Sequence, residues 1–419
     1  MKKYVKNKNK FTFVDLFAGC GGLSEGFLQS EKFEALAHVE WEKAPVKVLR
    51  NRLAQKWDHS EDEALKRVIH FDVQKTDELL NGNWSDESQA RYSANNHEEV
   101  IKNGINEIID ASVDMVIGGP PCQAYSIAGR AQDKNSMKDD YRNYLFESFV
   151  KIVNNLNPKM FVFENVPGML SAAPGEIPVT ERIFDAFKEI GYEILPPEKL
   201  KDAVLNSSQF GVPQSRRRVI IVGLNKSWKE QPKLSAVYKS LKEFKTDKVL
   251  TTRDAIGKYE HLFPLEESCK ISGKNHSHQV VETKLSHHYP RYNNDRDINT
   301  FRKWVENNMN KKPMAERIAF YNDLHNKQSK HAKYRNLEWD KPSPTIVAHL
   351  HKDGLMFIHP DSKQARSITV REAATLQSFP EDFQFSDSQG TSFKMIGNAV
   401  PVTMAKHIAE IVSKFMENN

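Results

Sequence analysis

The chain has 419 residues, of which 39% are hydrophobic and 27% are charged, and its formal net charge is +5. This length allows one large domain and a smaller one, and because no apolar run reaches about 18 residues the sequence excludes a membrane-spanning helix. With only Cys20, Cys122 and Cys269, no CxxC pair and no signal-peptide core after the basic first residues, we expect a cytoplasmic protein without disulfides.

Six short apolar segments before residue 226 alternate with helical stretches, a pattern typical of a parallel β-sheet that is covered by helices. They are residues 11–17, 34–40, 67–72, 113–119, 159–165 and 217–224. Helices are expected to begin near Gly22, Tyr141 and Thr180. The polar stretch between Gln74 and Asp110 is interpreted as a surface insertion. The sequence therefore predicts an α/β fold.

The segment from Lys226 to Pro360 differs from the rest of the chain in charge. It has 25 lysines and arginines against 16 acidic residues, a net of +9, whereas the remainder has a net of −4. A basic insert favours a polyanionic partner, although a solvated surface explains the charge equally well. We therefore expect one α/β domain, residues 1–225 and 361–419, interrupted by a module at residues 226–360.

The first predicted strand leads directly into FAGCGG (17–22). Its glycines allow a tight turn and close approach of the backbone, so that a ligand can lie at the N-terminus of the next helix. Glu40 ends the second strand about 20 residues later, where its carboxylate can accept ribose hydroxyls. Trp41 offers a flat surface for an adenine ring and Asp72 a polar group for its edge. This pattern suits NAD, FAD or S-adenosylmethionine, and a turn that serves packing alone is the alternative.

Cys122 follows two prolines in GGPPCQAYS (118–126), after the fourth predicted strand. Ligands bind at this edge of a parallel sheet, and the prolines restrict the backbone around the thiol. The thiol is a candidate nucleophile if its pKa is lowered, and a buried, inert cysteine is the alternative. The fifth strand brings FENVPGM (163–169) to the same edge, where Glu164 can act as a general acid oriented by Asn165. The pair predicts covalent catalysis on an electrophile.

Six motifs occur in the order and spacing of the DNA cytosine-5 methyltransferase family, and together they span residues 11–410. They are DLFAGCGGLSEGF (15–27), GGPPCQAYS (118–126), FENVPGM (163–169), QSRRRVIIVG (214–223), RSITVREAATLQSFP (366–380) and GNAVPVTMAKHI (397–408). The chain therefore resembles the bacterial restriction-modification members of this family. The resemblance implies a class I S-adenosylmethionine-dependent, Rossmann-like fold with a mixed, mostly parallel sheet, and a target recognition domain at 226–360.

The resemblance also implies the chemistry. It gives Cys122 the attack on carbon 6 of cytosine, which makes carbon 5 nucleophilic toward the methyl group of S-adenosylmethionine. It gives Glu164 proton donation or hydrogen bonding at ring nitrogen 3. Arg218, the second arginine of the QxRxR pattern, is expected to contact oxygen 2 of the base, and Arg216 completes the catalytic set. Arg217 lies outside the pattern and is interpreted as a surface residue.

Two larger sets follow from the same resemblance. The residues expected to bind the cofactor are Phe17, Gly19, Gly21, Gly22, Glu40, Trp41, Asp72, Val73, Pro120, Asn398 and Val400. Those expected to bind the substrate are Pro121, Gln123, Ser126, Asn165 and Gln214. No metal site is expected, because neither the His276 and His278 pair nor the His349 and His351 pair has an accompanying cysteine or third ligand.

The implied partner is double-stranded DNA. The target cytosine must be flipped out of the duplex to reach Cys122, and residues 126–146 resemble the loop that closes over it in this family. Candidate DNA contacts are His287, His288, Arg291, Arg296, His349, His351 and Lys352. Val370 and Ser378 stand where the family usually has proline and glycine. We expect a monomer that works together with a restriction endonuclease.

Two other functions stay open at this point. The first is the same chemistry on tRNA, as in one eukaryotic branch of the family, although the compact insert of that branch contrasts with the segment of roughly 135 residues here. The second is a regulator that binds DNA without catalysis. Such a regulator is disfavoured, since Cys122 and Glu164 are both present.

Overall fold

The computed structural model describes residues 10–109, 111–121, 145–271, 273–281, 285–386 and 388–417. By its internal contacts the chain divides into two compact units. Unit 1 comprises residues 1–210, 217–246 and 399–419, and unit 2 comprises residues 211–216 and 247–398. No helix in the described part of the chain combines the length and the apolar character that crossing a bilayer requires.

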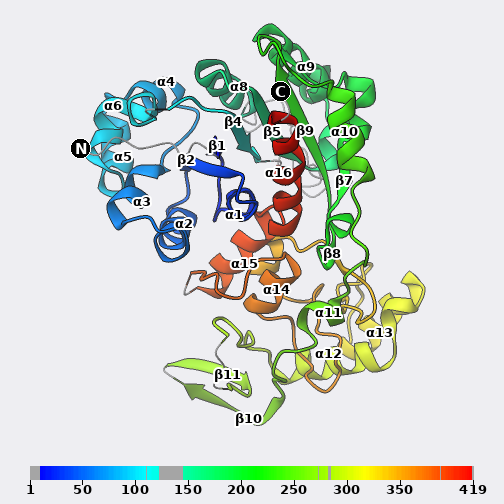
Figure 1. Cartoon of the computed structure of the whole chain (residues 1–419). Coiled ribbons are helices and arrows are strands. Elements are labelled where there is room, and N and C mark those ends of the chain that lie inside the picture. The colour runs from blue at the N-terminus through cyan, green and yellow to red at the C-terminus, as the bar shows by residue number, and fades with distance from the viewer. Residues whose placement is uncertain are drawn as a thin grey trace. The chain divides into compact units, whose positions relative to one another are not determined.

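Unit 1 is built on an eight-stranded sheet with the order β3-β2-β1-β4-β5-β9-β6, and β7 also pairs with β9 (Figure 1). The strands are β1 (Phe11–Leu16), β2 (Phe33–Glu40), β3 (Val68–His70), β4 (Met115–Gly118), β5 (Met160–Asn165), β6 (Tyr192–Glu193), β7 (Val204–Asn206) and β9 (Arg217–Asn225). The first five pair in parallel. The pairs around β9 are antiparallel. This sheet confirms the predicted fold class and contains all six predicted strands.

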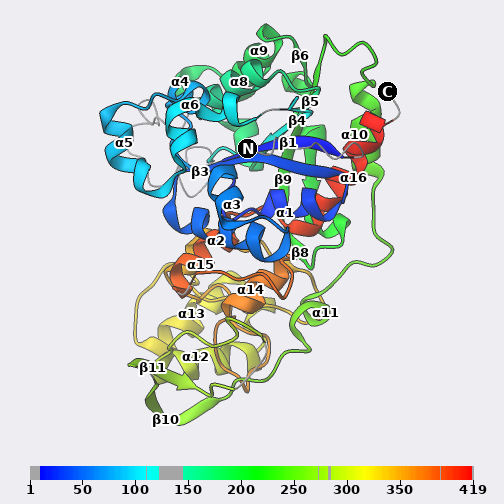
Figure 2. The same cartoon turned by 60° about the vertical axis from the view of Figure 1, so that its left-hand side comes forward.

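Helices cover both faces of the sheet, which is why its strands are continuous apolar runs. Phe13 pairs with Met115, which pairs with Met160, so Phe13 and Phe161 point to opposite faces. Phe13 contacts Phe27 of α1, whereas Phe161 stacks on Phe187 of α9. Figure 2 accordingly shows α1 and α16 on one side of the sheet and α8 and α9 on the other.

The helices of unit 1 include two of the expected starts. They are α1 (Gly22–Gln29), α2 (Lys43–Lys56), α3 (Glu61–Arg67), α4 (Thr76–Asn81), α5 (Asp86–Tyr92), α6 (Glu98–Ile108), α8 (Leu145–Leu156), α9 (Val179–Glu189), α10 (Leu234–Glu243) and α16 (Val402–Glu417), with short 3-10 turns such as η1 (Ser93–Asn95). The starts near Gly22 and Thr180 are confirmed by α1 and α9. Tyr141 lies outside the described residues.

The polar stretch after Gln74 is a helical module made of α4, α5, η1 and α6. Although most of its residues are polar, it buries Leu79, Leu80, Trp84, Tyr92, Val100 and Ile105. Trp84 stacks on Phe71, the residue after β3, with ring centroids 4.2 Å apart. The interpretation as a surface insertion therefore missed a small packed module that adjoins the sheet (Figure 2).

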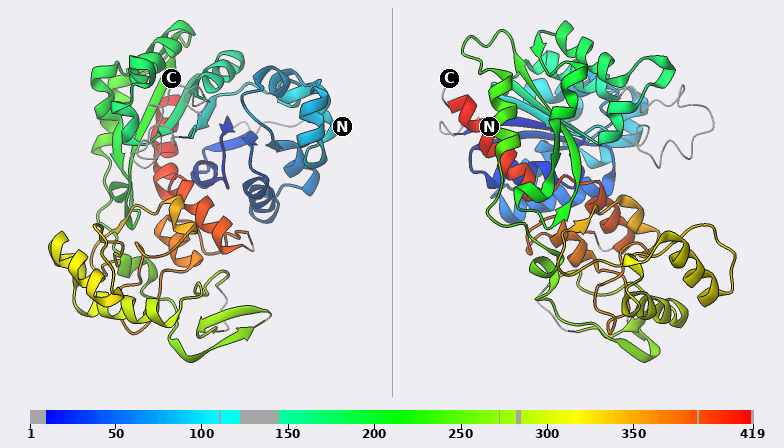
Figure 3. Two further views of the ribbon diagram at one scale, coloured as in Figure 1. Left: turned by 180° about the vertical axis from the view of Figure 1, so that it is seen from behind. Right: turned by 90° about the vertical axis from the view of Figure 1, so that its right-hand side faces the viewer.

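Unit 2 consists of short elements around a smaller core. They are β8 (Gln214–Ser215), α11 (Thr252–Ile256), β10 (Pro264–Ile271), β11 (Lys274–His278), α12 (Asp295–Glu306), α13 (Met314–His325), β12 (Ser343–Pro344), η8 (Ala348–His351), α14 (Val370–Leu376) and α15 (Gln389–Asn398). One apolar cluster contains Phe301, Trp304, Met309, Tyr321, Tyr334 and Ile358. The β10–β11 hairpin is antiparallel and mostly exposed, and it stands out from the rest of unit 2 in Figure 3.

The division into units differs from the expected boundaries after residues 225 and 360. Residues 226–246 lie with unit 1, because the Tyr238 hydroxyl of α10 hydrogen-bonds to the backbone of β9. Residues 361–398 lie with unit 2, where Arg371 donates to Ser286 and to the carbonyl of Phe383. The motif at 366–380 therefore belongs to the smaller unit by its packing.

Candidate active site

The turn after β1 has an uncommon backbone conformation. Phe17, Gly19 and Gly21 have φ angles of 60°, 57° and 90°, in the left-handed region that favours glycine. A Cβ on Gly21 would lie 2.6 Å from Leu49, and one on Gly22 would lie 2.7 Å from the carbonyl oxygen of Val400. The turn therefore needs its glycines, and the end of the chain packs directly against the start of α1.

Glu40, at the carboxyl end of β2, braces this turn. Its Oε2 accepts the Gly19 N–H at 2.8 Å and its Oε1 accepts the Glu42 N–H at 2.8 Å. Burial raises the pKa of Glu40 to about 7, against the effect of these N–H donors. A carboxylate can accept about four hydrogen bonds, so Glu40 keeps capacity for a further donor. Burial also raises the pKa of Cys20 in the turn to about 12, so this thiol is not a competing nucleophile.

The groups expected at an adenosine site gather at the ends of adjacent strands. Trp41 follows Glu40 and is 45% exposed, which leaves a flat apolar surface beside a buried carboxylate. Asp72 follows β3, and its Oδ1 accepts the N–H of Gln74 at 3.0 Å. Val73 is buried, and Pro120 follows β4 in the same sheet. Acceptor groups, a flat aromatic surface and a glycine turn at one sheet edge fit a nucleoside ligand.

Glu164 lies near the end of β5 and forms an ion pair with Arg218 of the neighbouring strand β9. The distance from Arg218 Nε to Glu164 Oε1 is 2.6 Å, and each side chain is 11% exposed. A Cβ on Gly119 would lie 2.7 Å from Glu164 Oε2, so only glycine leaves room for the carboxylate in this position. The arginine and the glycine together fix the direction of the Glu164 carboxyl group.

Cys122, Gln123 and Ser126, with most of the predicted closing loop at 126–146, lie outside the described residues. The segment that leads to Cys122 is described as far as Pro121, which is partly exposed. Asn165 was expected to orient Glu164. Its Nδ2 instead donates to the Pro120 carbonyl at 3.4 Å, and its Oδ1 accepts the N–H of Val166 at 2.9 Å. Asn165 therefore holds the backbone of Pro120, two residues before Cys122 in the sequence.

Gln214 was expected to bind substrate, but it is fully buried in unit 2. Its Nε2 donates to Gln377 Oε1 at 2.8 Å and to the Leu376 carbonyl at 3.1 Å, while its Oε1 accepts the N–H of Ile346 at 2.8 Å. An amide engaged in this way ties three chain segments together. In the described part of the chain, both polar atoms of the Gln214 amide are therefore engaged by protein groups.

Arg216 is also buried, with 1% exposure, and it belongs to unit 2. It donates to the carbonyl oxygens of Ile346 at 2.7 Å and Gly397 at 2.9 Å. Arg216 therefore holds backbone, whereas Arg218 faces Glu164 and Arg217 is exposed, as expected. Asn398 follows Gly397 as the last residue of α15 and is exposed.

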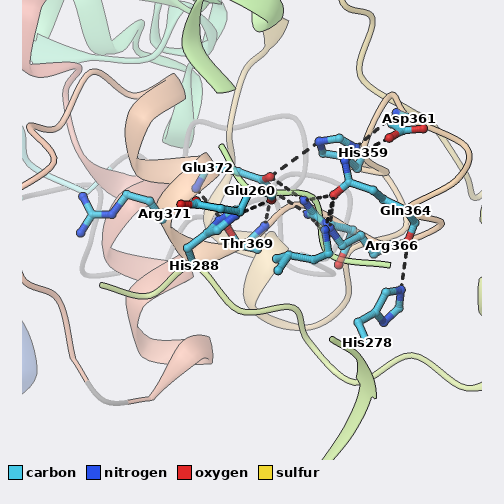
Figure 4. Close-up of polar contacts among 12 residues, drawn as sticks. Glu260, His278, His288, His359, Asp361, Gln364, Arg366, Thr369, Arg371 and Glu372 are labelled. Atoms are coloured by element: carbon cyan, nitrogen blue, oxygen red, sulfur yellow. Dashed lines mark hydrogen bonds and ion pairs between the residues drawn. The ribbon is translucent and has the colours of Figure 1, made fainter. Parts of the chain in front are cut away.

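The motif at 366–380 builds a buried polar network in unit 2 (Figure 4). Arg366 donates to both oxygens of Glu372, each at 2.7 Å. Glu372 also forms a capping box with Thr369 at the start of α14. Although burial opposes ionisation, the Arg366 guanidinium holds the pKa of Glu372 well below its usual range. Because Glu372 is already satisfied by protein groups, this motif supports the unit.

Two of the candidate DNA contacts belong to the interior of unit 2. His288 is buried, and its ring nitrogens lie 3.2 Å from Thr369 Oγ1 and 3.0 Å from the Glu260 carbonyl (Figure 4). Arg291 donates to the Leu350 carbonyl at 2.7 Å. Arg296, His349, His351 and Lys352 are exposed. These four side chains are accessible, as side chains that contact DNA must be. His288 and Arg291 instead hydrogen-bond to groups inside unit 2.

The two departures from the family pattern lie in this region. Val370 is fully buried as the first residue of α14. Ser378 has a φ angle of 58°, which explains why glycine is usual at this position, and its Oγ donates to the carbonyl of Gln377 at 2.7 Å.

A comparison with known protein families identifies the chain. The model for C-5 cytosine-specific DNA methylases matches residues 11–83 and 69–414. The chain belongs to this family. It is 33% identical to the type II methyltransferase M.Bpa9945I of Bacillus paralicheniformis, over 95% of this chain and 98% of that protein. It is 31% identical to the type II methyltransferase M1.HphI of Haemophilus parahaemolyticus, over 100% of this chain and 91% of that protein.

Solved structures share the fold of this methylase. One, from E. coli, is described as a DNA modification methyltransferase encoded within a prophage, and it matches with a TM-score of 0.59 and 22% identity over 97% of this chain and 100% of that chain. Another, S. pombe Dnmt2, matches with a TM-score of 0.55 and 14% identity over 98% and 99%. The resemblance drawn from the six motifs is therefore confirmed, and the fold is that of class I S-adenosylmethionine-dependent methyltransferases.

Proposed function

We propose that this methylase transfers a methyl group to carbon 5 of a cytosine in duplex DNA. The observation that carries the proposal is the ion pair of Glu164 and Arg218 beside Gly119. This pair stands at the carboxyl edge of the sheet, where the chain leads toward Cys122, and β4 joins it to the glycine turn of β1. An oriented carboxyl group and an adenosine-type site then share one sheet edge, and Cys122 follows in sequence the segment of this edge that ends at Pro121.

S-adenosylmethionine, when bound, supplies the electrophilic methyl group. The spare acceptor capacity of Glu40 suits the two ribose hydroxyls, and the exposed Trp41 ring suits the adenine face. Asp72 and Val73 complete the adenine side. Phe17, Gly19, Gly21, Gly22, Pro120, Asn398 and Val400 are the remaining proposed cofactor residues. The glycine turn allows backbone N–H groups to approach the ligand closely.

Three residues of the chain have separate roles in the proposed reaction. The Cys122 thiolate adds to carbon 6 of the flipped cytosine, which breaks the aromaticity of the ring and places electron density on carbon 5. Glu164 in its protonated form donates a proton or hydrogen bond at ring nitrogen 3, which lowers the barrier to this addition, and the proton returns to Glu164 when elimination restores the aromatic ring. Arg218 fixes the Glu164 carboxyl group and contacts oxygen 2 of the base. A base removes the carbon 5 proton after transfer, and elimination then releases Cys122.

The proposed biological role is protection of DNA in a restriction-modification system. Relatives in two bacteria carry the name type II methyltransferase, and the segment from Lys226 to Pro360 has a net charge of +9, which favours binding to a polyanion. The proposal includes a monomer that acts in the cytoplasm beside a cognate endonuclease.

Labelled S-adenosylmethionine and a set of duplexes with varied sequence test the proposal. We expect label on cytosine carbon 5 in one sequence context, and complete loss of transfer in Cys122→Ser. Arg218→Ala should lose transfer, while Arg217→Ala, the exposed neighbour, should keep it. Label on tRNA rather than DNA, or equal activity of the two arginine variants, would contradict the assignment.

A further inference from the structure

β3 is the edge strand of the sheet, and a side chain replaces the strand that is missing beside it. Asn96, next to η1 in the helical module, accepts the N–H of His70 through Oδ1 at 2.9 Å and donates to the His70 carbonyl through Nδ2 at 2.8 Å. The same Nδ2 donates to the carbonyl of Tyr92 at 3.0 Å. The amide thus satisfies both backbone groups of His70, as a neighbouring strand would.

The His70 side chain continues this connection toward Trp41. Its Nε2 lies 3.0 Å from the carbonyl oxygen of Trp41. Because a carbonyl can only accept, Nε2 carries the proton, and Nδ1 is buried without a partner among the described residues. Burial lowers the pKa of His70, so the ring is neutral in this single tautomer. Tyr92 holds the ring edge-on, with centroids 5.2 Å apart.

The module also holds the residue after His70. Phe71 lies between Trp84 and Tyr92, with ring centroids 4.2 and 5.1 Å away, and its N–H donates to the Glu40 carbonyl at 3.0 Å. Asp72 follows directly. The module therefore contacts His70 and Phe71 directly. These two residues in turn hydrogen-bond to the carbonyls of Trp41 and Glu40, and Phe71 precedes Asp72.

We propose that the helical module of residues 74–109 positions the adenosine end of the cofactor, and that Asn96 and His70 are the positioning residues. The inference rests on the proposed function, because Trp41 needs this support only if it receives the adenine ring. The backbone of residues 40–41 is held between Gly19, through the Glu40 carboxylate, and His70, through the Trp41 carbonyl. When the Trp41 side chain is already held in one orientation, less conformational entropy is lost as the adenine ring binds to it.

Substitutions at His70 separate this role from simple packing. His70→Phe keeps an aromatic ring beside Tyr92 but removes the donor to Trp41, whereas the amide nitrogen of His70→Gln can take the place of Nε2. We expect His70→Phe, which loses one hydrogen bond to Trp41, to weaken binding of S-adenosylhomocysteine by about fivefold to tenfold. Asn96→Ala loses three hydrogen bonds, so it should weaken binding at least as much. His70→Gln should bind within about twofold of the unchanged protein.

Asn106→Ala is the matched control within the module. Asn106 donates to Asn81 Oδ1 at 3.1 Å, so its loss removes a hydrogen bond between α4 and α6 without touching β3. This variant should bind the cofactor product as the unchanged protein does. If Asn106→Ala weakened binding as much as Asn96→Ala, the module would act only through its stability and the proposal would fail.

Calorimetric titration of the full chain with S-adenosylhomocysteine measures these affinities without DNA or turnover. Quenching of tryptophan fluorescence on binding, compared with Trp41→Phe, reports the adenine contact itself. At saturating cofactor, kcat for DNA should stay unchanged in His70→Phe while KM for S-adenosylmethionine rises. Unchanged affinity in folded His70→Phe and Asn96→Ala would overturn the inference alone, whereas an unchanged protein that fails to bind would overturn the proposed function.

Discussion

Buried carboxylates serve different purposes in the two units. In unit 1, Glu40 lies at a strand end and accepts backbone N–H groups, with capacity left for a ligand, and Glu164 faces Arg218 at the same sheet edge. In unit 2, Glu372 accepts both Arg366 bonds and the Thr369 N–H, with His359 3.6 Å away. A motif residue that protein groups already satisfy supports the fold, while one with spare capacity at a sheet edge is available for chemistry.

The largest effect should come from the Glu164 carboxyl group. Glu164→Gln keeps the shape and can still face Arg218, but it cannot transfer a proton, so we expect kcat to fall by about 10²–10⁴-fold, the usual contribution of a general acid. Single-turnover methyl transfer measures this loss. The new amide oxygen can still accept from Arg218, so the variant should stay folded, which urea denaturation checks. A Glu164→Gln protein with nearly full activity would mean that Glu164 only binds the base.

In unit 2, a substitution at the buried ion pair should lower the stability of the protein and leave the catalytic step unaffected. Arg366→Met leaves Glu372 buried without its main partner, which should cost about 3–5 kcal/mol in the free energy of unfolding. The double variant Arg366→Met with Glu372→Met should recover part of this loss, since no buried charge is then left. Urea denaturation measures both.

The exposed pair of Lys258 and Glu381 provides the control in the same unit, with side chains that are 63% and 47% exposed. Lys258→Met should change the free energy of unfolding by less than about 1 kcal/mol, because exposed ion pairs are weak. If Arg366→Met were equally mild, the network would not be the support that its geometry suggests.

Gly119 offers a smaller test of the site. A methyl group added at this position would lie 2.7 Å from Glu164 Oε2, so Gly119→Ala should displace the carboxyl group and lower kcat by up to about 100-fold, as misplaced groups do. Gly390→Ala is the control, since its Cβ would meet nothing nearer than 3.9 Å. A steady-state assay decides: equal rates for both variants would show that the Glu164 carboxyl group tolerates movement.

The sequence predicts the sheet well because the strands of a sheet that is covered on both faces are unmistakable apolar runs. It misses the helical module after Gln74 because short, polar helices carry few apolar positions, and the packing of Trp84 on Phe71 is a tertiary contact. The boundaries that it predicts after residues 225 and 360 differ from those of the compact units, because motif order carries no information on packing. For instance, the Tyr238 hydroxyl of α10 hydrogen-bonds to the backbone of β9, so α10 packs with unit 1.

At the site, the sequence identifies residues but not their partners. The ion pair of Glu164 with Arg218 depends on the antiparallel register of β5 and β9, which no local pattern encodes. Gln214 and Arg216 belong to the same family pattern as Arg218, yet their partners lie more than 100 positions away in the chain. Arg216 donates to backbone carbonyls, and Gln214 bonds to backbone groups and to the Gln377 side chain. Only the folded structure separates the arginine that pairs with Glu164 from the arginine that holds the backbone.

The smallest expected effect is a pH dependence of cofactor affinity through Glu40. Burial raises its pKa to about 7, above the ordinary value for a carboxyl group, so ionising Glu40 opposes folding, and its stabilising contribution is complete at low pH and lost as pH rises through 7. Ribose hydroxyls donate to the carboxylate and therefore favour the ionised form. Affinity for S-adenosylhomocysteine should accordingly rise by up to about tenfold between about pH 6 and pH 8, opposite in sign to the stability. Calorimetric titration across this range should give a sloped profile for the unchanged protein and a flat one for Glu40→Gln; a flat profile in both would mean that Glu40 stays ionised and that its N–H donors outweigh burial.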